Sequence, residues 1–273
     1  MKPHLTPVRL CVSLLACLVL LTGCQLQANT PPAISQPVQA TDTLPTQLPA
    51  ATKPPAAHQA DGSSAISVNI LLDPALAQDT DSLKLNQSLY QGLVRLDASG
   101  KVQPALAESW VVSDDQLDYI FKLRPTAAFS DGTFVTPDVV AANFNRWFDP
   151  QSPLRGSGDY AAWQRIFLGF HGEKDANGRP KSPVDGIQKV DLNTVLVHLN
   201  RLEPNLLTYL ADPAFAILKP EALAAGGYGV QKSTIISSGS YVVSSWTDAG
   251  LTLSPNPKYW DTASKDDLKF TWH

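Results

Sequence analysis

The chain has 273 residues, of which 44% are hydrophobic and 17% are charged, a composition typical of one large or two small globular domains. It carries 21 Lys and Arg against 25 Asp and Glu, and the resulting net charge of −4 argues against a nucleic-acid-binding protein, which would normally carry a basic face. All three cysteines, Cys11, Cys17 and Cys24, lie in the first 24 residues. The rest of the chain therefore has neither a disulfide framework nor a zinc–thiolate site.

The N-terminal segment has the pattern of a lipoprotein signal peptide. Two basic residues precede a 12-residue apolar run from Leu10 to Leu21, which is too short to cross the roughly 30 Å hydrocarbon core of a bilayer. The run ends in Leu21-Thr22-Gly23-Cys24, which resembles the lipobox of bacterial lipoproteins. We expect a signal peptide over residues 1–23 and lipidation of Cys24, which would attach the exported protein to a bacterial membrane, facing the periplasm or the cell exterior. The alternative is an ordinary signal peptide with an incidental cysteine.

A linker is expected next, over residues 24–64. Residues 25–64 contain seven prolines, eight alanines and no aromatic residue, and such a segment cannot bury enough apolar area to offset the entropy lost on ordering. We expect a disordered, lipid-anchored tether. A proline-rich ligand for a partner is the alternative. All 22 aromatic residues occur at Tyr90 or later, which places the start of the folded domain near Ser64.

Short strands and helices alternate in the first part of the expected domain. Ile66, Val68 and Ile70 have the period of two that is typical of a strand. A helix is expected from Thr80 to Gly92, with the glycine as its stop. The further expected elements are a hairpin over 93–102 with its turn at 97–100, and a strand over 119–124.

The second part of the expected domain begins with a turn at 130–133 and a helix that starts at Thr136-Pro137-Asp138. Thr is a favourable N-cap, Pro fits the first helical position, and the acid complements the positive helix end. Val140, Phe144 and Trp147 form its expected buried face. A polar surface loop is expected over 171–186. Further strands are expected at 195–199, 215–218, 241–246 and 251–253, and further helices at 205–210 and 221–225. This mixture indicates an α/β or α+β fold.

No sequence motif points to an enzyme. The chain lacks the GxSxG, HExxH and SxxK patterns and any phosphate-binding glycine loop. Ser130-Asp131-Gly132 is interpreted as a turn, and 226–229 as a flexible glycine-rich loop. His198 alternates out of an apolar strand face, so we expect it to be exposed and not to bind a metal. The sequence therefore predicts no catalytic residue, no cofactor and no metal site.

Several sequence blocks resemble, in order and spacing, the family 5 extracellular solute-binding proteins, which include dipeptide, oligopeptide and nickel binders. The blocks are Leu72-Asp73-Pro74, Ser88-Leu89-Tyr90-Gln91-Gly92-Leu93-Val94, Pro104 to Trp110, Phe121 to Arg124, Phe129 to Thr133, Thr136 to Val140, Ser238 to Tyr241, and Asn256 to Trp260. Trp110 and Tyr259-Trp260 are expected to be structural. One departure is Ser240, where the family usually has a proline before the tyrosine.

The resemblance implies an α/β fold of the periplasmic-binding-protein type II kind. Residues 65–90 and 186–273 would form a first lobe with a mixed sheet, and residues 91–185 an inserted small α+β subdomain. Family members continue beyond the block at 256–260 into a second lobe, and we expect that lobe to be absent here. A one-lobed chain is expected to bind peptide weakly or not at all, because relatives close two lobes around the ligand.

The resemblance also implies the substrate-binding component of an ABC importer, which captures peptides or similar small solutes and has ABC permease subunits as partners. The alternative is a truncated family member, or a surface lipoprotein with an interaction role and little solute binding. In peptide-binding relatives the loop corresponding to 77–82 faces the cleft, so Gln78, Asp79 and Thr80 are the expected ligand-binding residues. The helix that follows could accept an anionic group at its N-terminus. Alternatively, Asp79 or Thr80 only caps that helix.

Overall fold

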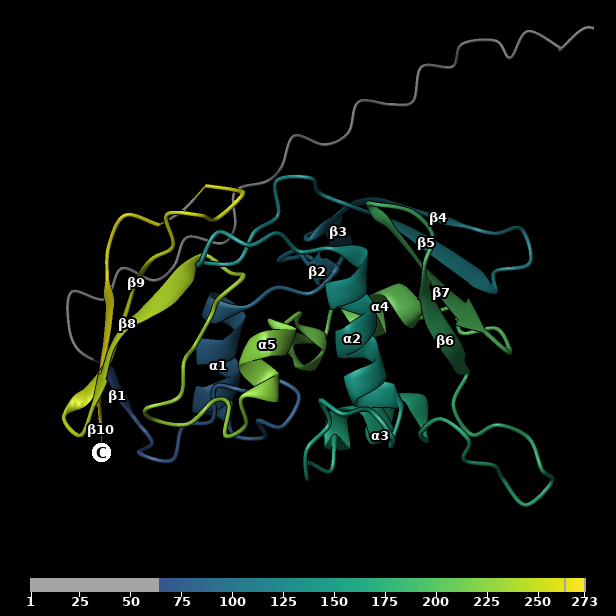
Figure 1. Ribbon diagram of the computed structural model, residues 1–273, viewed down its shortest axis with the longest axis horizontal. Helices are drawn as coiled ribbons and strands as arrows, with labels where there is room; N and C mark the ends of the chain where they lie inside the picture. The colour runs from purple at the N-terminus through teal and green to yellow at the C-terminus, as the bar shows by residue number, and fades with distance from the viewer. Residues whose placement is uncertain (1–63, 263, 273) are drawn as a thin grey trace, which may run out of the picture. The chain divides into compact units, whose positions relative to one another are not determined.

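The computed structural model describes residues 64–262 and 264–272 (Figure 1). The expected signal peptide, Cys24 and nearly all of the expected linker lie outside these residues. The strands are β1 (Ser64–Ile66), β2 (Val94–Leu96), β3 (Val102–Pro104), β4 (Ala107–Val112), β5 (Asp118–Leu123), β6 (Val184–Lys189), β7 (Thr194–Leu199), β8 (Tyr241–Thr247), β9 (Gly250–Pro255) and β10 (Leu268–Trp272). The helices are α1 (Thr80–Leu89), α2 (Pro137–Phe148), α3 (Ala161–Phe167), α4 (Leu206–Leu210), α5 (Pro220–Ala224) and a 3-10 turn, η1 (Pro213–Phe215).

One four-stranded sheet, in the order β4-β5-β7-β6, is entirely antiparallel, and we call it the antiparallel sheet. Tyr119, Phe121 and Leu123 of β5 are buried, while Ile120 and Lys122 between them are exposed, as the period of two predicts. Helix α2 contacts β6 and β7 (Figure 1). The buried face of this sheet and the helix together form a core.

Aromatic side chains fill much of that core. The ring centroid of Trp163, on α3, lies 6.3 Å from that of Phe144 and 4.4 Å from that of Phe167. Phe215 is 5.3 Å from Trp147 and 5.8 Å from Trp163. All five side chains are at most 3% exposed. Such large side chains contribute most of the apolar area that this core buries.

The antiparallel sheet joins strands from both sides of the expected boundary at 185/186. β4 and β5 lie within the expected inserted subdomain, and most of β6 and all of β7 lie in the range expected for the first lobe. β7 nevertheless pairs with β5 along its length, from Asp118 opposite His198 to Lys122 opposite Thr194. The division into 65–90 with 186–273 and 91–185 stays a prediction.

The second four-stranded sheet, in the order β1-β10-β9-β8, contains one parallel and two antiparallel pairs, and we call it the mixed sheet. Its parallel pair places Ser64 opposite Phe270 and Ile66 opposite Trp272. Helix α1 contacts β8 (Figure 1). A second core lies here and includes Leu85, Leu89 and Leu253.

Several expected elements are confirmed. The hairpin of β2 and β3, the strands β5, β7, β8 and β9, and the helices α4 and α5 form where the sequence indicated them, to within two residues at each end. Helix α2 begins as expected, with the Thr136 side chain accepting a hydrogen bond from the Val139 N–H and Pro137 in the first turn. Its predicted face of Val140, Phe144 and Trp147 is buried.

Two strand predictions were wrong. β1 ends at Ile66, and Val68 is 57% exposed, so Ile66 and Ile70 are buried without a continuous strand between them. Residues 215–218 belong to η1 and the extended segment after it, and form no part of a strand. Ile217 donates its N–H to the carbonyl of Gln91, a single contact and not a ladder.

The predicted end of one helix and two predicted loops also need correction. Helix α1 ends at Leu89 and does not extend to Gly92. Gly92 instead lies in a tightly packed place, where a Cβ would be 3.3 Å from three carbonyl oxygens. The polar loop stops short of 186, because β6 begins at Val184, which is buried. The glycine-rich loop at 226–229 is anchored by a buried tyrosine, Tyr228. Strands β4, β6 and β10 and helix α3 were not foreseen.

Candidate functional site

The three expected ligand-binding residues lie next to one another on the surface. Gln78, Asp79 and Thr80 are exposed and connect a turn, residues 72–77, to the first turn of α1. Residues 72–75 of that turn are buried. Within the described part of the chain the side chains of Gln78 and Thr80 have no hydrogen-bond partner. Their amide and hydroxyl groups are therefore free to bind a solute.

Asp79 is the N-cap of α1. Its Oδ1 accepts a hydrogen bond from the Ser82 N–H at 2.8 Å. Slight burial acts to raise the pKa of Asp79, but the hydrogen bonds from Ser82 and nearby backbone outweigh it, so the pKa is lowered and the carboxylate stays ionised. A second acid, Asp81 in the first turn, accepts from the Ser67 N–H at 2.9 Å. Two carboxylates of the protein thus already occupy the helix N-terminus, which makes it a poor site for an anion.

The turn that leads into this segment is organised by Asp73. Its Oδ1 accepts from the Ala75 N–H at 3.2 Å, and its carbonyl oxygen accepts from the N–H groups of Leu76 and Ala77 at 3.1 and 2.8 Å. Asp73 is buried, although Asp is almost never fully buried unless it is paired. Its partner is a cation on another element.

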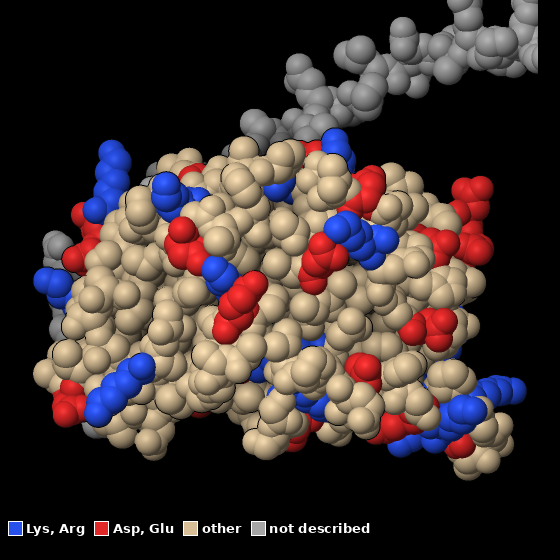
Figure 2. Space-filling view, viewed as in Figure 1, with Lys and Arg blue, Asp and Glu red and all other residues tan. Residues whose placement is uncertain are grey.

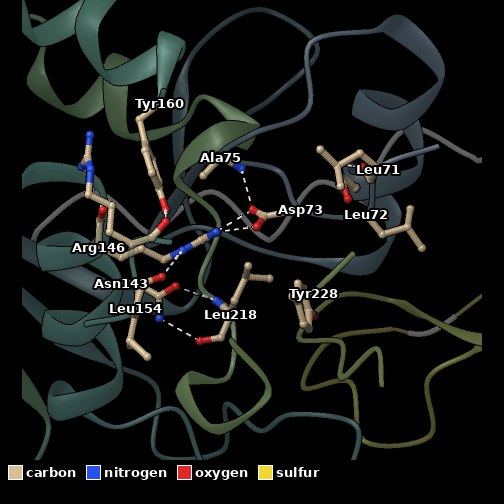
Figure 3. Close-up of polar contacts among 12 residues, drawn as sticks. Leu71, Leu72, Asp73, Ala75, Asn143, Arg146, Leu154, Tyr160, Leu218 and Tyr228 are labelled. Atoms are coloured by element: carbon tan, nitrogen blue, oxygen red, sulfur yellow. Dashed lines mark hydrogen bonds and ion pairs between the residues drawn. The ribbon is translucent and has the colours of Figure 1, made fainter. Parts of the chain in front are cut away.

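That cation is Arg146 on α2 (Figure 3). Both of its terminal nitrogens donate to the Asp73 carboxylate, the Nη1–Oδ1 distance being 3.2 Å, and both side chains are 3% exposed. The Arg146 Nε donates to the carbonyl of Leu154 at 3.1 Å, and the guanidinium carbon lies 5.4 Å from the centre of the Tyr160 ring. This two-point geometry fixes the orientation of both groups.

Two tyrosines hold the other end of the turn. The Tyr90 hydroxyl donates to the carbonyl of Leu72 at 3.0 Å and lies 2.9 Å from the Tyr228 hydroxyl. The Leu72 N–H donates to the carbonyl of Gly229 at 2.7 Å. Burial raises the pKa of both tyrosines far above neutral pH, so both hydroxyls stay protonated and the network carries no charge of its own.

Arg146 and Asp73 were not singled out from the sequence as site residues. The sequence did contain a sign of buried polar residues, because Asn143 and Arg146 are three residues apart among the apolar positions of the expected helix. In the structure both side chains are buried. Asn143 pairs with the backbone of Leu218, donating to its carbonyl at 2.7 Å and accepting its N–H at 3.0 Å (Figure 3). A polar residue at a buried helix position indicates a partner elsewhere in the chain.

Acidic and basic side chains are interspersed on the face shown in Figure 2. Among the described residues there is no group of three or more His, Cys, Asp or Glu side chains that could hold a metal ion. Hollows of about 160 and 230 Å³ are lined by residues outside 77–82. Within 64–262 and 264–272, no helix has both the length and the apolar character needed to cross a membrane.

Sequence comparison finds relatives for most of the chain. The model of the family described as "Bacterial extracellular solute-binding proteins, family 5 Middle" matches residues 101–271. The periplasmic murein peptide-binding protein MppA of Escherichia coli K12 is 27% identical over 205 residues, which are 74% of this chain and 37% of that protein. The glutathione-binding protein GsiB of Escherichia coli O1:K1 is 30% identical over 202 residues, which are 74% of this chain and 35% of that protein.

Structure comparison finds the same fold. HbpA2 from Haemophilus parasuis matches with a TM-score of 0.67 and 26% identity over 77% of this chain and 42% of that one. The substrate-binding domain of an oligopeptide ABC transporter from Bacillus anthracis matches with a TM-score of 0.61 and 28% identity over 77% and 41% of the two chains. The expected α/β fold of the type II binding-protein kind is therefore confirmed. The chain spans only 35–37% of the length of the two curated relatives.

Proposed function

Since the chain belongs to the family 5 bacterial extracellular solute-binding proteins, we propose that it contributes to the capture of peptides or similar small solutes for an ABC importer. The observation that carries the proposal is the exposed segment 78–80, which presents free polar groups at the end of a buried, ion-paired turn. The permease subunits of the importer would be its partners. The proposal needs no catalytic residue and no cofactor.

The electrostatics of the segment favour one class of solute group. Asp79 is exposed and ionised, and Asp81 lies two residues further on. A carboxylate of a solute would be repelled here, whereas an ammonium or another N–H donor would be attracted. We therefore expect Gln78, Asp79 and Thr80 to face the amino-terminal end or a cationic side chain of a peptide. We thus expect a cationic solute group at this segment, and not the anionic group that the helix N-terminus alone suggested.

Solution NMR provides the test, because it detects binding as weak as about 1 mM, which corresponds to only about 4 kcal/mol. The full chain is titrated with a pool of short peptides, and separately with the same pool N-acetylated. We expect saturable shifts of the amides at 77–82 with the free peptides and smaller shifts with the acetylated ones. Saturation without any change at 77–82 would remove these residues from the solute site. No saturable shift with either pool would refute solute capture by this chain.

A matched pair of variants sharpens the test. Asp79→Asn removes the charge but keeps a good N-cap, so the fold is preserved. Asp114→Asn removes another exposed acid, from the turn between β4 and β5. We expect the first variant to weaken peptide binding several-fold, and the second to leave it unchanged. Equal affinities for the two variants would show that Asp79 serves only as a helix cap.

We also propose that the protein is exported and anchored through lipid on Cys24, as the apolar run ending in Leu21-Thr22-Gly23-Cys24 predicts. Its relatives include proteins named as periplasmic. In bacteria fed a labelled fatty acid, the wild-type chain should incorporate label, and Cys24→Ala should lose it and stay unprocessed. Cys17→Ala, within the apolar run, is the matched control and should keep the label. Full labelling of Cys24→Ala would disprove the anchor.

A further inference from the structure

The ion pair between Asp73 and Arg146 differs from the other ion pairs of residues 64–262 and 264–272. It is the only one whose two side chains are both buried. The next most buried pairs are Lys219–Asp131, with side chains that are 15% and 32% exposed, and Arg95–Asp261, with side chains that are 28% and 20% exposed. Removing two charges from water is costly, and well-packed apolar residues are often at least as stabilising as a buried pair. The pair is therefore better explained by the geometry that it imposes than by stability.

That geometry concerns the turn at 72–77. Arg146 holds the Asp73 carboxylate, and the same carboxylate accepts the Ala75 N–H, so α2 directly orients the turn. On the other side, Gly229 lies so close that a Cβ on it would be 2.8 Å from the backbone nitrogen of Asp73. The Tyr90 hydroxyl holds the Leu72 carbonyl. The turn is thus held from three separate parts of the chain.

Beyond the turn this support ends. The N–H of Ala77 bonds to the Asp73 carbonyl, and the next backbone contact is the Leu83 N–H to the carbonyl of Asp79, in the helix. Gln78 lies between these two anchors, with its side chain in solvent. Fixing both flanks limits the conformations of a short exposed segment without covering its polar groups. This is the arrangement that a preorganised binding segment needs.

We propose that Asp73 and Arg146 are positioning residues for solute binding, which hold residues 77–80 in the conformation that contacts the solute. The inference rests on the proposed function, because it assigns these residues a role at the same site. Without the pair, the solute would have to order the segment itself. A tenfold loss of affinity, equivalent to about 1.4 kcal/mol, is comparable to the cost of fixing the backbone of one residue.

The test uses the full chain with the double substitution Asp73→Leu/Arg146→Met, which removes both charges and keeps apolar bulk. Two quantities are measured, the amide exchange of Ala75, Leu76 and Ala77 and the peptide affinity from NMR titration. Amides in the paired strands β5 and β7 report global stability. We expect exchange at 75–77 to become about tenfold faster and affinity about tenfold weaker, with exchange in β5 and β7 unchanged.

A second variant covers the case in which the double variant does not fold. Arg146→Lys keeps the charge but loses the two-point contact, and it should show the same changes to a smaller extent. A folded variant that binds peptide as the wild type does, or that binds less only in proportion to a loss of protection in β5 and β7, overturns the positioning role. A wild-type chain that binds no peptide refutes the proposed function instead, and the positioning role with it.

Discussion

The two four-stranded sheets have the same number of strands but differ in where those strands lie in the chain and in the side chains of their cores. The antiparallel sheet takes all its strands from residues 107–199 and packs them under a core of large aromatic rings. The mixed sheet pairs β1, at the start of the described chain, with β10, near its end, and its core is mainly aliphatic. β1 contributes only three residues, two of them exposed. The first sheet depends on side-chain packing and the second on a distant backbone pairing.

This difference implies that the two sheets are sensitive to different substitutions. The core of the antiparallel sheet should be most sensitive to the loss of side-chain volume, because dense packing leaves cavities when a large ring is removed. The mixed sheet should be most sensitive to any group that separates its strands. A substitution that is severe in one sheet should therefore be mild at a comparable place in the other.

The largest effect is expected for Trp163→Ala in the aromatic core. The side chain is 1% exposed, contacts several rings, and donates its indole N–H to the Gly169 carbonyl at 2.9 Å. Removing it should lower the free energy of unfolding by about 3–5 kcal/mol, which denaturant titration measures. Phe134→Ala is the control, because Phe134 is 60% exposed, and its effect should be small. Similar losses in both variants would mean that the core is not the source of stability.

Gly250→Ala should have the next largest effect, in the mixed sheet. A Cβ at this position would lie 2.2 Å from the Phe270 carbonyl oxygen, so β9 and β10 would have to separate. The expected loss is about 1–3 kcal/mol, with faster amide exchange in β10. Gly186→Ala in β6 is the matched control, because a Cβ there has no neighbour within 4 Å. If the two variants were equally stable, close backbone approach would not limit the mixed sheet.

A smaller loss of stability is expected when the charge of Asp131 is removed. Asp131 lies in the turn of residues 129–133 and forms an ion pair with Lys219. Partial burial acts to raise the pKa of Asp131, but hydrogen bonds from Lys219 and Thr133 outweigh it and lower the pKa to about 2 from its ordinary value of 3.8. A depressed pKa adds stability above pH 4 that is lost as the pH falls from about 4 to 2.

The Asp131→Asn variant should therefore be about 1 kcal/mol less stable than the wild type at pH 6, after allowance for solvent screening. The difference should shrink as the pH falls from about 4 to 2, because the wild-type carboxyl then becomes neutral. Thermal unfolding of both proteins across this range measures it. A constant difference at all pH values would show that Asp131 acts without its charge.

The smallest effect is expected at the N-cap of α1. Asp79→Ala removes the hydrogen bond to the Ser82 N–H and should cost about 0.5 kcal/mol, the low end for caps because the residue is exposed. Asp79→Asn should cost almost nothing. The stabilities of the two variants are compared by their midpoints of denaturant unfolding. Equal midpoints would show that the cap adds nothing to the stability of this part of the chain.

The elements that could be predicted from the sequence are those whose signals are local. The buried residues of β5 and β7 recur with a period of two, and α2 begins with its own cap. β6 was missed because its sequence, VDGIQK, contains a glycine and no regular alternation. β10 does alternate, with Leu268, Phe270 and Trp272 on one face, and one of its partners, β9, is near in sequence. Its other partner, β1, lies at the far end of the described chain. No local pattern signals such a partner.

In the candidate site, too, local features could be predicted from the sequence and long-range contacts could not. Asp79 as a helix cap was one of two open interpretations, since capping depends on neighbours three residues away. The buried pair of Asp73 and Arg146 was not foreseen, because charged residues are usually exposed and the partners come from distant segments. Likewise Tyr259 and Trp260 contact Gln91, with the Trp260 indole N–H donating to the Gln91 side chain at 2.9 Å. Pairs of this kind are set by the folded topology.

The parallel pairing of β1 with β10 also has a consequence for the order of folding. The hairpin of β8 and β9 and the antiparallel sheet connect segments that lie comparatively near one another along the chain, and such contacts form early. β1 leaves the ribosome before any of them but has no partner until β10 has been made. Closing so long a loop is an entropic barrier that must be crossed before the contact stabilises anything. We therefore expect the mixed sheet to be completed last, with the apolar side chain of Ile66 uncovered until then.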